Sequence, residues 1–168
     1  MAIFLYYALV YIFACIWQFV LGQFMPFDVY PNFILVVIIY MGLTRGTMTA
    51  QTFGFILGIT WDMFSTDVFG SRAFMFTIVG YFVGKFSKDL HASNIPAQMI
   101  LTFCASVIVW LGLGLVYLAS SPAESAAYFA MTRVDIYRIM VLVLVSPVFF
   151  ASLKFLEGLI INGLAERR

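Results

Sequence analysis

Residues 96–118 read PAQMILTFCASVIVWLGLGLVYL, an apolar run that contains no Asp, Glu, Lys or Arg. About 20 apolar residues in a helix cover the roughly 30 Å hydrocarbon core of a bilayer. A run of this length and composition predicts a membrane-spanning helix. The rest of the chain has the same character: 64% of its residues are hydrophobic and only 10% are charged, whereas a soluble domain carries about 25% charged residues. Lipid must therefore be the solvent for much of this chain.

Six apolar segments can be marked by working outward from this run. They cover about residues 3–21, 31–43, 48–64, 73–86, 96–118 and 139–161. The second and fourth are short for a span, so we expect them to tilt little, to recruit flanking residues or to be shielded by neighbouring helices. We predict an all-α fold in which residues 1–168 form one integral membrane domain, a polytopic bundle of about six transmembrane helices.

The connections between the segments contain signals for turns and for one additional helix. Arg45-Gly46 is a very short break, so the second and third segments should form an antiparallel hairpin. The longest connection contains Ser121-Pro122-Ala123-Glu124, a capping box with Pro at the first helical position. We therefore predict a short interfacial helix over about residues 122–131.

The basic residues of the loops indicate the orientation of the bundle, because Lys and Arg favour the cytoplasmic side. With six spans and the N-terminus inside, the larger basic set is cytoplasmic: Arg45, Lys85, Lys88, Arg167 and Arg168. The smaller set is external: Arg72, Arg133 and Arg138. Lys154, near the end of the last segment, should extend toward the cytoplasmic interface. Both termini are predicted to be cytoplasmic.

Two glycine motifs mark the third and fourth segments. Gly54 and Gly58 form one GxxxG, and Gly80 and Gly84 form another. Small residues at this spacing allow membrane helices to approach closely. The simpler interpretation is that these glycines pack the third and fourth helices against each other or against the rest of the bundle. The alternative is that they form a docking face for another protein.

Asp62 shares the helix face of Gly54 and Gly58 and lies near the end of an apolar segment. A carboxylate inside a membrane helix is costly unless it is paired or hydrated. Arg72, at the head of the next segment, is its natural counter-charge. We favour a structural ion pair between Asp62 and Arg72 over a proton or ligand site, because one interfacial carboxylate is weak evidence for transport.

The remaining residues disfavour several classes of function. Cys15 and Cys104 both lie in apolar runs, which is typical of small buried hydrophobes rather than of a disulfide or a metal site. His91 is the only histidine and lies in a polar loop. No catalytic triad, phosphate-binding glycine loop or Cys/His cluster is present, and the net charge of +1 contains no basic block for nucleic acid. We expect no enzyme activity, no metal, no cofactor and no nucleic-acid partner.

The order of these motifs resembles the MreD family of bacterial rod-shape-determining membrane proteins. The resemblance covers about residues 30–86 and rests on a Pro-[Asp/Asn] helix start, an Arg-Gly turn, a GxxxGxxxD helix, a glycine-containing loop and a Gly-Tyr-x-x-Gly helix. The positions of this chain that match are Pro31, Gly54, Gly58, Asp62, Gly70, Gly80 and Gly84. One departure is Asn32, where Asp is common in the family, so a role for a charge at that position is in doubt.

The resemblance implies a non-enzymatic component of the machinery that elongates the lateral cell wall, located in the bacterial cytoplasmic membrane. It implies a fold similar to the six-helix substrate-binding subunits of energy-coupling-factor transporters. It also implies a bitopic MreC-type partner and, through that protein, the actin-like MreB, a RodA-type glycosyltransferase and a class B penicillin-binding protein. The matching glycines, Pro31 and Asp62 would then shape the hairpin that holds the bundle and a partner surface.

These observations favour three functions to different degrees. A scaffold or regulator that binds partner helices in the membrane agrees best with the glycine faces and the absence of a catalytic set. A solute-binding or transport subunit is the alternative, but such a protein should gather several polar groups at mid-membrane depth. This chain offers few of them, chiefly Gln18, Gln51, Thr52 and Thr60. An intramembrane enzyme is the least favoured.

Overall fold

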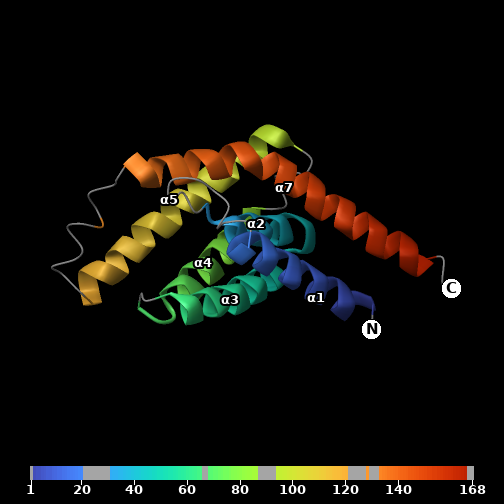
Figure 1. Ribbon diagram of the computed structural model, residues 1–168, viewed down its shortest axis with the longest axis horizontal. Helices are drawn as coiled ribbons and strands as arrows, with labels where there is room; N and C mark the ends of the chain where they lie inside the picture. Colours follow the sequence, from blue (N-terminus) through green and yellow to red (C-terminus); the bar gives the residue numbers. More distant parts are fainter. Residues whose placement is uncertain are drawn as a thin grey trace.

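The computed structural model describes residues 2–20, 31–65, 68–86, 94–120, 128 and 133–165. These residues are all-helical, which confirms the predicted fold class for the described part of the chain (Figure 1). The α-helices are α1 (Ala2–Cys15), α2 (Phe33–Arg45), α3 (Thr47–Phe64), α4 (Ser71–Phe86), α5 (Ile95–Ser120) and α7 (Arg133–Ala165). A π-helix, η1 (Ile16–Val20), continues α1.

Helix α2 forms the centre of the molecule. Every residue from Phe33 to Gly42 is buried, and α2 packs on α1, α3, α4, α5 and α7. A helix that is apolar on all sides is suited either to the core of a bundle or to lipid, and the contacts of α2 with its neighbours place it in the core. The neighbouring helices thus provide the shielding that so short an apolar segment needs.

An aromatic cluster joins η1 and α7 to the start of α2. The Phe33 and Phe149 rings stack with centroids 4.7 Å apart, and the Trp17 ring meets Phe149 edge-on at 4.2 Å. These rings come from η1, α2 and α7. Aromatic pairs in these geometries contribute about 0.5–1.5 kcal/mol beyond the area that they bury, so the cluster fixes α7 and η1 against the core.

The helices alternate in direction, so the molecule has two ends. The Arg45 end contains the start of α1, the close of α2 and the last part of α7, because Arg45 contacts both Tyr6 and Glu157. The Asn32 end contains η1 and the starts of α2 and α7. Gln18 hydrogen-bonds Ile34 there, and Asp135 lines a cavity with Asn32. This alternation is compatible with the predicted topology.

Two helices are long and apolar enough to cross a membrane, over residues 95–120 and 134–159, among the residues that the structure describes. Two shorter apolar helices cover 6–19 and 33–45. The count of six spans therefore stays a prediction. Helix α7 begins at Arg133 rather than near Ile139, because a polar turn with Asp135 and Arg138 precedes its apolar run. Apart from Tyr128, the predicted interfacial helix over 122–131 lies outside the described residues.

Pro147 lies inside α7, and the ribbon of this helix changes direction near its middle (Figure 1). Proline has no N–H to donate to the carbonyl four residues earlier, which here belongs to Val143. The Ser146 hydroxyl donates to that carbonyl oxygen at 2.8 Å instead. The adjacent serine therefore satisfies the acceptor that the proline would leave unpaired, and the change of direction lies at the proline, where helices commonly kink.

Candidate functional site

The four glycines of the two GxxxG motifs line one seam between α3 and α4. A Cβ atom placed on Gly58 would lie 2.3 Å from the Ala73 Cα, and one placed on Gly84 would lie 2.4 Å from the Thr47 Cα. Gly54 and Gly80 likewise meet backbone atoms of the opposite helix, at 2.5 Å and 2.7 Å. Because backbone atoms cannot move aside as side chains do, each position requires glycine for this packing.

The glycine faces of α3 and α4 are therefore buried against each other's helix inside the molecule. Gly42 of α2 also joins this seam, since a Cβ there would lie 2.8 Å from the Val83 Cγ1. A second protein could reach the glycines only if α3 and α4 separated. A partner surface on the packed bundle must therefore lie elsewhere, on the outward faces of the helices.

Asp62 supports the same hairpin with its carboxylate. Its side chain is fully buried, and Oδ2 accepts a hydrogen bond from the Ala73 N–H at 3.1 Å. Oδ1 lies 3.7 Å from the Arg72 Nη1. Ala73 is in the first turn of α4, where backbone N–H groups have no partner within the helix and a negative charge is favourable. Asp62 thus caps α4 from the neighbouring helix and pairs with Arg72.

Arg72 has further contacts that hold it beside Asp62. Its Nη1 donates to the Ser65 Oγ at 2.8 Å, and its guanidinium lies over the Trp61 ring at 5.4 Å. Gly70 precedes α4 with a φ of +87°, a backbone conformation that residues with a side chain rarely adopt. The end of α3, the turn at Gly70 and the start of α4 therefore form one polar corner at the Asn32 end.

The start of α2 has two side-chain caps, from Asn32 and Gln18. Asn32 Oδ1 accepts from the Leu35 N–H at 3.2 Å, as an N-cap residue does. Gln18 Oε1 accepts from the Ile34 N–H at 3.4 Å, and its amide donates to the Pro31 carbonyl at the same distance. Nothing in the local sequence of Gln18 identifies a cap for a distant helix.

A second polar group, not anticipated from the sequence, occupies the Arg45 end. Arg45 Nη2 donates to the Glu157 Oε1 at 2.6 Å, and the Tyr40 hydroxyl donates to the Glu157 Oε2. The Arg45 guanidinium also lies over the Tyr6 ring at 5.0 Å. The available signal was Glu157 itself, since an acidic residue in an apolar segment calls for a partner.

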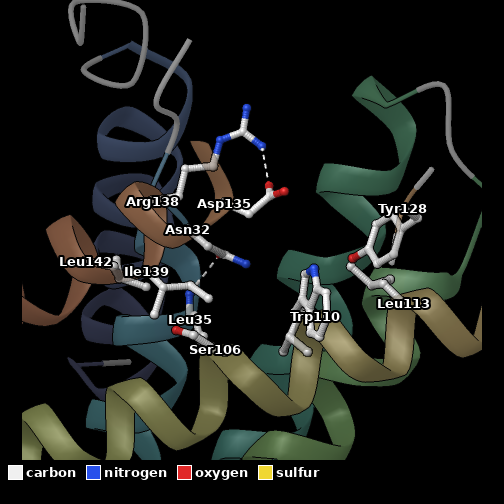
Figure 2. Close-up of a pocket in the computed structure, with 11 residues that line it drawn as sticks. Asn32, Leu35, Ser106, Trp110, Leu113, Tyr128, Asp135, Arg138, Ile139 and Leu142 are labelled. Carbon is white, nitrogen blue, oxygen red and sulfur yellow. Dashed lines mark hydrogen bonds and ion pairs between the residues drawn. The ribbon is translucent and has the colours of Figure 1, made fainter. Parts of the chain in front are cut away.

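Figure 2 shows a cavity of about 130 Å³ at the Asn32 end, between α2, α5 and α7. The Trp110 indole and the Tyr128 ring lie on one side of it, stacked with their centroids 6.3 Å apart. Asn32 and the Asp135–Arg138 ion pair lie on the other side. In this pair the Arg138 Nη1 is 3.3 Å from the Asp135 Oδ1. The cavity combines an aromatic wall with both signs of charge. No group of three or more His, Cys, Asp or Glu side chains suited to a metal occurs in the described residues.

Two apolar grooves open on the outer surface. The α4–α5 groove, of about 280 Å³, has small and β-branched residues at its floor and bulky residues at its rims. Its lining is Val79, Phe82, Val83, Phe86, Leu101, Cys104, Ala105 and Ile108. The α1–α3 groove, of about 360 Å³, is lined by Tyr7, Ala8, Tyr11, Thr52, Phe53 and Ile56.

Comparisons with known proteins agree with the motif order. A family model described as rod shape-determining protein MreD matches residues 1–156. The chain is also similar to a protein of Bacillus subtilis (strain 168) named rod shape-determining protein MreD. The two are 27% identical over 130 residues, which cover 74% of this chain and 76% of that protein. No solved structure matches the chain, and the similarity to energy-coupling-factor subunits stays a prediction.

Proposed function

Because this chain belongs to the MreD family of rod shape-determining membrane proteins, we propose that it is a non-enzymatic scaffold of the cell-elongation complex. Its role in rod shape follows from the family. The proposal adds that it binds an MreC-type bitopic protein through the transmembrane helix of that protein. MreB, a RodA-type glycosyltransferase and a class B penicillin-binding protein would be engaged indirectly, through this partner.

The single observation that supports this role is the placement of the glycine seam. The close approach that GxxxG motifs permit is used between α3 and α4, which makes the hairpin a rigid wall rather than an open face. The outer side of this wall carries exposed aromatic residues of α4, namely Phe74, Phe82 and Phe86. A rigid apolar wall is a suitable platform for another membrane helix.

We place the partner helix in the α4–α5 groove. Helix α4 packs much more extensively on α3 than on α5, which leaves the groove open. Its lining contains the buried Ala105, a small residue that allows a second helix to approach closely. The α1–α3 groove is less suitable, because Tyr7, Tyr11 and Phe53 fill much of its lining.

Co-purification in mild detergent tests this function. The chain is co-expressed with a tagged MreC-type protein, and partner recovery is measured for Cys104→Trp, which adds bulk at an exposed position of the α4–α5 groove. We expect recovery to fall several-fold at unchanged thermal stability. Ala8→Trp adds the same ring to the α1–α3 groove and serves as the control. Equal recovery for both variants and the wild type would contradict the placement.

Solute binding is the second candidate, and the cavity of Figure 2 is the observation that favours it. Its amide, ion pair and aromatic wall are groups that orient small polar ligands. A thermal-shift screen of zwitterionic and aromatic metabolites against the wild type and Asn32→Leu would test it. A ligand that stabilises only the wild type would support this candidate, and the absence of any shift would count against it.

A further inference from the structure

A second cavity lies at the Arg45 end, between α2, α5 and the second half of α7. Its volume is about 330 Å³, and it is separate from the glycine seam, the partner groove and the cavity of Figure 2. Its lining is Tyr40, Thr44, Ile95, Gln98, Pro147, Phe150, Ala151, Lys154 and Glu157. Neither the motif comparison nor the proposed scaffold function uses this space.

The lining of this cavity is mixed in polarity. Phe150, Ala151 and Pro147, all from α7 near its proline, are the apolar part of the lining. Tyr40, Thr44 and Lys154 carry polar groups, and the Tyr40 ring also packs edge-on against the Phe150 ring, with centroids 5.6 Å apart. A cavity lined by apolar side chains and a cation suits an amphipathic molecule better than a small soluble one.

Of the charged side chains that line this cavity, one is a cation available to bind an anion. Both carboxylate oxygens of Glu157 are occupied, Oε1 by Arg45 and Oε2 by the Tyr40 hydroxyl. The positive charge of Arg45 offsets this carboxylate. Lys154 is exposed and is the one charged side chain lining this cavity that forms no ion pair. An anion at this position would therefore meet Lys154 with the nearest carboxylate already neutralised.

We propose that this cavity binds the phosphodiester of an anionic phospholipid, with Lys154 contacting the phosphate and an acyl chain beside Phe150 and Ala151. Basic pockets between transmembrane helices on the cytoplasmic side are a recognised form of lipid-headgroup site. The basic residues of the loops assign the Arg45 end to that side. The Thr44 hydroxyl donates to the Tyr40 carbonyl and the Tyr40 hydroxyl donates to Glu157, so Lys154 is the charged donor of this cavity for the phosphate. The proposal is independent of partner binding.

Native mass spectrometry of the full-length protein tests this site. The protein in detergent is titrated with phosphatidylglycerol or with phosphatidylcholine of the same acyl chains. Both lipids carry a phosphodiester, but only the first carries a net negative charge. We expect the wild type to retain phosphatidylglycerol, and Lys154→Gln to weaken this binding about tenfold, the loss of one charge-assisted hydrogen bond.

Lys85→Gln is the matched control, because Lys85 is also exposed and is also predicted to be cytoplasmic but lies over Tyr81, away from the cavity. It should bind phosphatidylglycerol as the wild type does. Ala151→Phe keeps Lys154 but fills the apolar part, and should weaken binding of the lipid.

Three results would overturn the proposal. An equal loss for Lys85→Gln and Lys154→Gln would mean general charge attraction. Equal retention of the two lipids would mean that the net negative charge of the headgroup is not recognised. Inorganic phosphate or glycerophosphoglycerol that competes as strongly as the lipid would assign the site to a soluble phosphate ester instead.

Discussion

Gly58 and Gly158 are both helical glycines, yet an alanine at each would meet opposite surroundings. A Cβ on Gly58 would lie 2.3 Å from the Ala73 Cα, whereas a Cβ on Gly158 would have no atom within 4 Å. We expect Gly58→Ala to destabilise the fold by about 1–3 kcal/mol, as overpacking does. Gly158→Ala should be neutral or stabilising by about 0.5–1 kcal/mol, because alanine has the higher helix propensity. Thermal unfolding in detergent measures both, and equal midpoints would contradict the seam.

Two substitutions of Asp62 separate the contributions of its hydrogen bond to Ala73 and its ion pair with Arg72. Asp62→Asn retains an oxygen for the Ala73 N–H but loses the charge opposite Arg72, whereas Asp62→Ala loses both. We expect the alanine variant to be less stable by about 1–3 kcal/mol, the cost of a buried unpaired donor, and the asparagine variant to lose less. Thermal midpoints would rank them. A stable Asp62→Asn that fails to restore rod shape in a strain lacking its own MreD-type protein would show a role beyond the ion pair.

Substitutions of the two side chains that cap α2 test how much each cap stabilises this central helix. Asn32→Ala removes the acceptor of the Leu35 N–H and should cost about 1 kcal/mol. Asn32→Asp should cap equally well, since both side chains are good N-caps. Gln18→Ala removes the second cap and should add to the loss. Chemical unfolding of the single and double variants measures these losses; wild-type stability for Asn32→Ala would show that the cap contributes nothing.

Elements and sites were predictable to different degrees. Apolar run length predicted the helices, since a helix in lipid satisfies its backbone within one segment. The spacing of Gly54 and Gly58 indicated packing between the third and fourth helices, but not that these glycines meet the backbone at Phe76 and Ala73. Gln18 with Ile34, and Glu157 with Tyr40 and Arg45, join residues far apart in the chain. One sequence carries no signal for which distant helices meet, so these contacts could not be predicted.

The predicted membrane topology, with six spans and both termini on one side, can be tested on the whole molecule. The alternating helices and the gathering of Tyr6, Arg45 and Glu157 at one end are compatible with both termini on one side. In a variant without Cys15 and Cys104, single cysteines at Ala119 and Arg168 should be labelled from opposite sides of the membrane by an impermeant thiol reagent. Labelling of both from the same side would contradict the six-span arrangement.

The central claim is that this molecule is a scaffold that holds a partner helix in the α4–α5 groove. Its most direct test is site-specific photo-crosslinking in membranes that contain an MreC-type protein. Phe82 lines this groove and Ile56 lines the α1–α3 groove, and their exposures of 45% and 46% make them a matched pair. A photo-reactive residue at position 82 should crosslink to the partner, and one at position 56 should not. Crosslinks from 56 alone, or from neither position, would contradict the account.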